Sequence, residues 1–330
     1  MTWIKRLFLL TLLGTMIAAG SFAWYAQRPL TIELLPKTVR VAPGMHLKSL
    51  AAMLEREGVI GNAQAFWLLG RVLGKGHKLR AGTYTLDAPV SPLALLDKFE
   101  RGEVTLAAVQ FIEGWNWREV RAALAAQPLL KQDSAGMSDA EVLQAIGAGE
   151  QHPEGLLYPD TYLFAPHASD LQVLRRAYRL QQEKLAAAWV ARAPNLPYQT
   201  PYEALVMASI VEKETGAAHE RPEIAGVFVN RLRKGMRLQT DPTVIYGLGA
   251  RFDGNLRKID LQTDTPYNTY TRGGLPPTPI AMPSEAAIRA ALNPAKTQAL
   301  YFVSRNDGTH VFSATLEAHN RAVNQHQRRR

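Results

Sequence analysis

The chain has 330 residues, more than one hydrophobic core usually needs, so about two globular units are expected. Hydrophobic residues make up 47% of the sequence, which excludes a disordered chain because enough apolar surface exists to offset chain entropy. The absence of cysteine excludes disulfide frameworks, thiolate zinc sites, cysteine nucleophiles and a lipidated cysteine. Lys and Arg outnumber Asp and Glu by 38 to 29, and this formal charge of +9 raises the question of a nucleic-acid partner.

The N-terminus carries a run of twenty uncharged residues, 7–26, directly after Lys5 and Arg6. A helix of this length spans about 30 Å, the thickness of the hydrocarbon core of a bilayer. We therefore predict a transmembrane anchor over Leu7–Ala26, in preference to a cleaved signal peptide, whose apolar stretch is usually about 7–15 residues. The positive-inside rule places residues 1–6 in the cytoplasm and the rest of the chain beyond the membrane.

Residues 35–105 show short strand and helix patterns that predict a compact α+β module. A strand leads to a turn at Pro43-Gly44, and the helical pattern after it stops near Gly58. This strand–turn–helix opening resembles the LysM-type modules that bind glycans. A packing or spacer domain without a ligand is an equally open interpretation. Residues 106–150 are mostly helical in pattern and are expected to be a connecting region.

A buried helix is predicted to start at Thr200. Thr200 and Glu203 form a capping box with Pro201 at the first helical position. Residues 204–211 are apolar or small on every side, which is typical of a helix inside a core.

Glu212 follows this apolar run and shares a helix face with Leu205 and Ala208. Burial of a carboxylate raises its pKa, and a protonated carboxyl group is what cleavage of a glycosidic bond needs at the leaving oxygen. The alternative is that Glu212 only pairs with an arginine at the end of the helix. Glu214 on the opposite face and Glu220 in the next loop also remain candidates for the acid.

Three stretches carry a family resemblance: 208–215 (ASIVEKET), 227–232 (VFVNRL) and 236–247 (MRLQTDPTVIYG). They closely resemble the YceG-like family, the endolytic murein transglycosylases, also called MltG. Shorter matches continue in the same order to near the C-terminus, so the resemblance is strong over about residues 150–325. It implies a YceG-like catalytic domain over residues 151–330. The predicted fold is thus α+β: a transmembrane helix, a LysM-like module, and a mixed α+β catalytic domain whose buried helix carries the acid/base Glu.

The resemblance implies that Glu212, the first Glu of the IVEKE motif, is the acid/base. It implies cleavage of the β-1,4 bond between N-acetylmuramic acid and N-acetylglucosamine without water. The muramyl 6-hydroxyl attacks its own anomeric carbon and leaves a 1,6-anhydro end. Because this nucleophile is tethered to the substrate, one carboxyl group suffices, and we expect neither a metal nor a cofactor.

Two polar and aromatic stretches, 237–246 and 267–270, are expected to contact sugar hydroxyl and acetamido groups. Self-capping of the first loop by Asp241 and Thr243, and core positions for the tyrosines, are open alternatives. The predicted binding residues are Arg237, Gln239, Thr240, Asp241, Thr243, Tyr246, Tyr267, Asn268 and Tyr270.

The predicted partners are peptidoglycan strands, the membrane and, by resemblance, peptidoglycan synthases. The predicted location is the bacterial inner membrane, with a periplasmic catalytic domain that trims or terminates nascent strands. A hydrolytic muramidase and a non-catalytic wall-binding scaffold are the competing functions. We do not expect nucleic-acid binding, because the basic residues are scattered and the only charge block is at 328–330.

Overall fold

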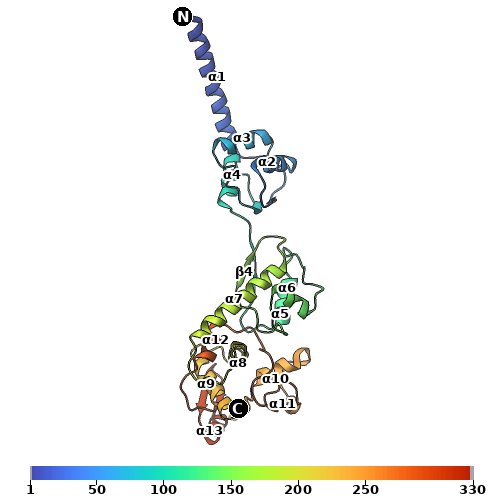
Figure 1. The fold of residues 1–330 in the computed structure, drawn as a ribbon, viewed down its shortest axis with the longest axis vertical. Coiled ribbons are helices and arrows are strands. Elements are labelled where there is room, and N and C mark those ends of the chain that lie inside the picture. Colours follow the sequence, from blue (N-terminus) through green and yellow to red (C-terminus); the bar gives the residue numbers. More distant parts are fainter. Residues whose placement is uncertain (1, 328–330) are drawn as a thin grey trace. The chain divides into compact units, whose positions relative to one another are not determined.

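The computed structural model describes residues 2–327, so the basic block at 328–330 lies outside the described residues. The chain divides into two compact units, Met1–Ala107 with Leu163–Pro166, and Ala108–Tyr162 with His167–Arg330. The described strands form two-stranded sheets among a larger number of helices (Figure 1). The fold is therefore mixed α+β with an apolar N-terminal helix, as the sequence predicts.

Helix α1 (Thr2–Gln27) contains the predicted anchor and begins a few residues before it. Its segment Trp3–Gln27 is long and apolar enough to cross a membrane. The last turns of the helix also pack against protein, because Ala26 is buried and Phe22 and Tyr25 lie against the core of the first unit. The candidate anchor thus continues without a break into that core.

The N-terminal module follows α1 and has the order strand, helix, helix, strand, helix. Strands β1 and β2 pair antiparallel, with Val39 opposite Tyr84, and both side chains are fully buried. Leu47, Leu50 and Leu54 recur at helical spacing on one buried face of the helix that follows β1. The elements are β1 (Lys37–Val41), α2 (Leu47–Arg56), α3 (Ala63–Val72), β2 (Gly82–Leu86) and α4 (Pro92–Arg101).

The region expected to connect the two domains contains two short helices, each with a capping box. Asn116 and Ser138 are the N-caps, and each accepts a backbone hydrogen bond while a Glu three residues later bonds back. Most of this region belongs to the same compact unit as residues 167–330. Its elements and the next ones are β3 (Ala107–Gln110), α5 (Trp117–Ala125), α6 (Asp139–Ile146), β4 (Thr161–Phe164), which pairs with β3, and α7 (Asp170–Val190).

Helix α8 (Pro201–Glu214) is the centre of the second unit. Every residue from Ala204 to Val211 is buried, and the helix packs against α7, α9, α10 and α12. It starts where the sequence predicts, with the Thr200 hydroxyl accepting from the amide of Glu203 at 3.2 Å. The Glu203 carboxylate, however, accepts from the amide of Gln199 rather than of Thr200, one residue earlier than a capping box requires.

The remaining elements surround the C-terminal end of α8. β5 and β6 form an antiparallel hairpin with Tyr301 opposite Ser313, and the last helix packs on both strands. The elements are α9 (Arg221–Arg233), α10 (Asp241–Leu248), the 3-10 turn η1 (Gly249–Arg251), α11 (Lys258–Gln262), α12 (Glu285–Leu292), β5 (Tyr301–Ser304), β6 (His310–Ser313) and α13 (Leu316–His326).

Candidate functional site

The last turn of α8 places Glu212, Lys213 and Glu214 in three different surroundings. Successive side chains on a helix point about 100° apart, so these neighbours cannot share one environment. The carboxyl group of Glu212 faces the start of α12, whereas Glu214 faces a cavity.

Glu212 is held by groups that leave its carboxylate little freedom. Its Oε2 accepts hydrogen bonds from the amide of Ser284 at 2.9 Å and the hydroxyl of Ser284 at 2.5 Å. Its Oε1 lies 3.4 Å from Nη2 of Arg221, and the side chain is 7% exposed. Because Ser284 is also the N-cap of α12, this carboxylate ties α8 to α12.

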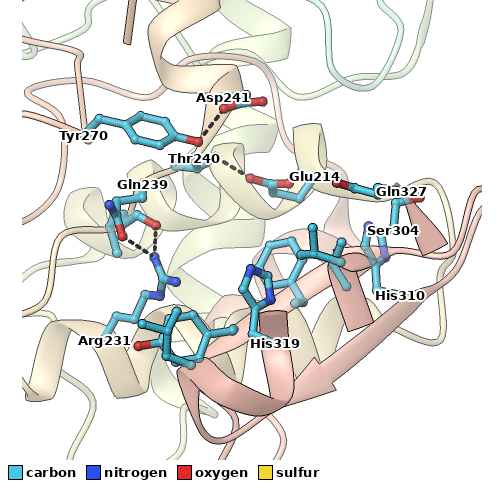
Figure 2. Close-up of a pocket in the computed structure, with 16 residues that line it drawn as sticks. Glu214, Arg231, Gln239, Thr240, Asp241, Tyr270, Ser304, His310, His319 and Gln327 are labelled. Carbon is cyan, nitrogen blue, oxygen red and sulfur yellow. Dashed lines mark hydrogen bonds between the residues drawn. The ribbon is translucent and has the colours of Figure 1, made fainter. Parts of the chain in front are cut away.

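Glu214 lines a cavity of about 490 Å³ (Figure 2). The hydroxyl of Thr240 donates a short hydrogen bond to its Oε1. Burial raises the pKa of Glu214 to about 7, the nearby charge of Asp241 adds to the rise, and the Thr240 hydrogen bond opposes it. A pKa near neutrality allows the group to donate and to accept a proton.

The opposite wall of this cavity carries two histidines, His310 from β6 and His319 from α13 (Figure 2). Nδ1 of His310 lies 2.7 Å from Oε2 of Glu220, whose Oε1 accepts from the His310 amide at 2.9 Å. Burial raises the pKa of Glu220, but these hydrogen bonds outweigh it and hold that pKa below its ordinary value. Glu220 therefore fixes the ring of His310 at the cavity wall.

His319 stacks on Tyr301, with ring centroids 5.3 Å apart. Its Nδ1 is buried and has no hydrogen-bond partner among residues 2–327. Burial lowers the pKa of His319, so the ring is favoured in its neutral form.

Arg231 supports the floor of the cavity through backbone carbonyl groups. Its guanidinium donates to the carbonyls of Leu300 and Leu238, each at 2.7 Å. Gln239 directly follows Leu238 and has a φ of 51°, in the left-handed region that residues other than glycine seldom adopt. The buried Arg231 thus holds a strained segment, residues 237–241, that carries four of the predicted binding residues, and backbone strain often occurs at functional sites.

Four of the predicted binding residues line this cavity: Gln239, Thr240, Asp241 and Tyr270. The hydroxyl of Tyr270 donates to Oδ1 of Asp241 at 2.5 Å, so two of the four hold each other (Figure 2). Exposed Arg237 donates to the carbonyl of Tyr270 at 3.1 Å beside them.

The other four predicted binding residues make contacts within the protein. Asn268 is fully buried, and its side-chain amide donates to the carbonyls of residues 260, 261 and 263. Thr243 is fully buried and donates to the carbonyl of Thr240. The rings of Tyr246 and Tyr267 meet at 4.9 Å. A binding role for these four stays a prediction, and the hydrogen bond from Thr243 to Thr240 agrees with the open alternative that the first loop caps itself.

His310 and His319 received no role from the sequence, although both lie in the cavity. His310 is 90 residues from its partner Glu220, so only the folded chain brings them together. Among the described residues, no group of three or more His, Cys, Asp or Glu side chains is arranged to hold a metal ion.

The comparisons with known proteins agree with one another. The sequence profile of the YceG-like family matches residues 39–325. An endolytic murein transglycosylase of Bacillus subtilis (strain 168) is 31% identical over 327 residues, which cover 93% of this chain and 90% of that protein. One from Streptococcus pneumoniae (serotype 2, strain D39) is 28% identical over 88% of this chain, which spans 58% of that protein. The fold is similar to a crystal structure of a yceG-like protein from Listeria monocytogenes, with a TM-score of 0.54 at 31% identity, over 86% of this chain and 98% of that one.

Proposed function

The chain belongs to the YceG-like family, and from that premise we propose that it is a lytic transglycosylase that cleaves peptidoglycan strands internally. The endolytic murein transglycosylases among its relatives support this reaction. The observation that carries the proposal is the position of Glu214, a half-buried carboxyl group with a pKa of about 7 in a cavity that polar and apolar side chains line.

In the proposed reaction, protonated Glu214 donates its proton to the glycosidic oxygen of N-acetylglucosamine as the bond to the muramyl anomeric carbon breaks. The muramyl 6-hydroxyl then bonds to that carbon, and its proton passes to the Glu214 carboxylate. The products are a free 4-hydroxyl and a 1,6-anhydromuramyl end, so water is not consumed and the enzyme regains its proton. A pKa near 7 suits a group that is first the acid and then the base.

Glu212 and Glu214 remain distinguishable candidates for this role. The sequence resemblance favours Glu212, and that assignment stays a prediction. The surroundings favour Glu214, because its side chain lines the cavity, whereas the carboxyl group of Glu212 is occupied by hydrogen bonds from Ser284 and by its pair with Arg221. We therefore assign the acid/base role to Glu214 and a positioning role to Glu212.

The test is product analysis by mass spectrometry after digestion of uncrosslinked glycan by the wild type, Glu214→Gln and Glu212→Gln. We expect 1,6-anhydro ends from the wild type and a loss of about a hundredfold or more in rate for Glu214→Gln, because general acid catalysis contributes that much. Glu212→Gln should lower both the rate of cleavage and the stability of the protein, because Glu212 only positions the helix. Thermal unfolding measures the loss of stability. Full loss in a stably folded Glu212→Gln, with an active Glu214→Gln, would reverse the assignment.

Other products decide between the competing functions. Reducing ends in place of anhydro ends would establish a hydrolytic muramidase. No cleavage by the full-length wild type, together with retention on peptidoglycan, would establish a binding scaffold.

We further propose that α1 anchors the protein in the inner membrane, with residues before Leu7 in the cytoplasm and the catalytic unit in the periplasm. The charges of Lys5 and Arg6 and the apolar length of α1 support this orientation. An enzyme held at the bilayer reaches only the peptidoglycan close to the membrane, where strands are newly made. The proposed role is therefore to terminate nascent strands near the synthases. Protease treatment of spheroplasts should digest the catalytic unit, and protection from the protease would contradict the orientation.

The LysM-like assignment of the N-terminal module also stays a proposal. Its support is the order β1, α2, α3, β2 with the two strands paired antiparallel. Retention of the full chain on purified peptidoglycan, compared with a chain from which residues 35–105 are deleted, measures whether the module binds glycan.

A further inference from the structure

A second cavity, of about 370 Å³, borders the same two helices as the Glu214 cavity. Lys213 and Pro242 line it, and they are the chain neighbours of Glu214 and Asp241, which line the first cavity. Neighbouring Cα atoms are about 3.8 Å apart, so the two cavities flank one short stretch of α8 and of α10. A substrate long enough to occupy both would pass beside Glu214.

The charges of this second cavity are all positive. Arg118 and Lys213 line it, and no acidic side chain of the described residues does. The guanidinium of Arg118 is exposed and forms no hydrogen bond or ion pair within residues 2–327. The ammonium of Lys213 donates to the carbonyl of Gly114 at 3.1 Å, which leaves further donors free for a ligand.

Two glycines lie beside these cations. A Cβ on Gly249 would lie 3.9 Å from the Arg118 guanidinium, and one on Gly114 would lie 3.7 Å from the Lys213 side chain. Both glycines have a positive φ, of 57° and 78°, that other residues seldom adopt.

Apart from Asn116, the other side chains of the lining are aromatic or aliphatic, among them Tyr246, Phe252, Ile245 and Ile280. Glu154 lies beside Tyr246 of this wall, is buried, and accepts from the amide of Trp117 at 3.0 Å. Burial raises the pKa of Glu154 to about 7, so it brings less than a full negative charge at neutral pH. An apolar wall with two cations is complementary to a ligand that joins a carboxylate to aliphatic groups.

We infer that the cavity of Arg118 and Lys213 binds a carboxylate of the peptide stem carried by the muramyl residue of the substrate. This inference rests on the proposed cleavage of peptidoglycan and adds recognition of the stem to it. Stem peptides combine free carboxylates with small aliphatic side chains, and they branch from the sugar whose anomeric carbon reacts. Arg118 forms paired hydrogen bonds with the carboxylate, and Lys213 adds a second charge.

The experiment compares two substrates, glycan strands with intact pentapeptide stems and the same strands stripped of stems by an amidase. Arg118→Gln should lower kcat/KM about tenfold on strands with stems and leave the rate on stripped strands within twofold, because it removes a charge-assisted contact with the stem alone. Arg118→Lys should fall between the wild type and Arg118→Gln. Arg179→Gln, an exposed arginine on α7 that lines neither cavity, is the matched control and should change neither rate.

An equal loss on both substrates would overturn the inference, since the cavity would then bind sugar or support the fold. No loss on strands with stems would overturn it as well. Thermal unfolding of each variant separates a folding defect from a binding defect.

A binding assay keeps the inference separate from the proposed function. N-acetylmuramyl pentapeptide titrated into the wild type should bind about tenfold more tightly than to Arg118→Gln, and equal affinity would overturn the inference. If the wild type cuts neither strand, the proposed function fails while this titration still decides what the cavity binds.

Discussion

At the scale of single residues, the site combines one carboxyl group that can change protonation with another that is fixed as a carboxylate. Half-buried Glu214 accepts a hydrogen bond from Thr240, whereas the carboxylate of Glu220 accepts two hydrogen bonds from His310. The same kind of side chain thus has a raised pKa in one position and a lowered pKa in the other. Surroundings, rather than residue type, separate their functions.

The pKa of Glu214 predicts the pH dependence of cleavage. The acid must be protonated, so kcat/KM should fall as pH rises through about 7, the pKa of this group. A positive charge on His310 lowers the pKa of Glu214, so His310→Gln should move this fall to higher pH. The measurement is a pH–rate profile with His77→Gln, an exposed histidine of the N-terminal module, as the control. An unshifted profile in His310→Gln would show that the two side chains are not coupled.

The same raised pKa has a consequence for stability. Burial raises the pKa of Glu214 above its ordinary value of 4.5, so the folded state keeps a proton that the unfolded chain releases. The contribution of Glu214 to the free energy of unfolding is therefore highest below pH 4.5, and it falls as the pH rises to about 7. Glu154, whose pKa burial raises to about 7, should contribute in the same direction.

At the scale of elements, the join between α8 and α12 depends on one hydroxyl group. The Oγ of Ser284 donates to Glu212 and accepts from the amide of Ala287 at 3.1 Å, so it caps α12 and holds α8 at once. The side chain is 2% exposed, and water cannot easily replace it. Ser284 therefore stabilises both the start of α12 and the contact between α8 and α12.

Ser284→Ala should therefore lower the free energy of unfolding of the second unit by about 2–4 kcal/mol, the sum of a lost cap and a lost hydrogen bond to a buried carboxylate. Ser138→Ala is the matched control, because Ser138 caps α6 in a similar way but is exposed, and it should cost about 1 kcal/mol. Urea unfolding monitored by circular dichroism measures the free energy of unfolding of each variant. Equal losses would mean that the Glu212 contact adds nothing to stability.

Elements with local signals could be predicted from the sequence, and contacts between distant elements could not. The buried helix starts at Pro201 as predicted, because Thr200 and the proline act within one turn. The alternation of side chains on α8 left Glu212 and Glu214 both open, because periodicity states which residues share a face but not what that face meets. Ser284 lies 72 residues from Glu212, and no local sequence pattern predicts the contact between them.

Several polar residues illustrate the same limit within the site. Gln239, Thr240, Asp241 and Tyr270 reach the cavity, while their neighbours Thr243 and Asn268 are fully buried in hydrogen bonds to the backbone. Side chains of one chemical kind serve either purpose, and the choice depends on the direction of each side chain in the folded loop. The sequence therefore located the loops of the site more accurately than the individual contacts.

At the scale of the whole molecule, helix α1 serves both as a candidate membrane span and as a part of the first unit. Phe22, Tyr25 and Ala26 pack on the core of the N-terminal module, and the amide of Leu30 donates to the carbonyl of Val90 at 2.9 Å just beyond the helix. A flexible link between anchor and module would leave these side chains exposed. The end of α1 is instead packed into the core of the module.

Two truncations separate these two tasks of α1. A chain that starts at residue 21 should leave the membrane fraction but keep the stability of the module, because the packed residues remain. A chain that starts at residue 28 should also be soluble, and its module should lose about 2 kcal/mol through the missing apolar contacts of Phe22, Tyr25 and Ala26. Thermal unfolding of both chains, together with hydrogen exchange of the module amides, measures the difference in stability. Equal stability of the two modules would show that the end of α1 contributes only to membrane attachment.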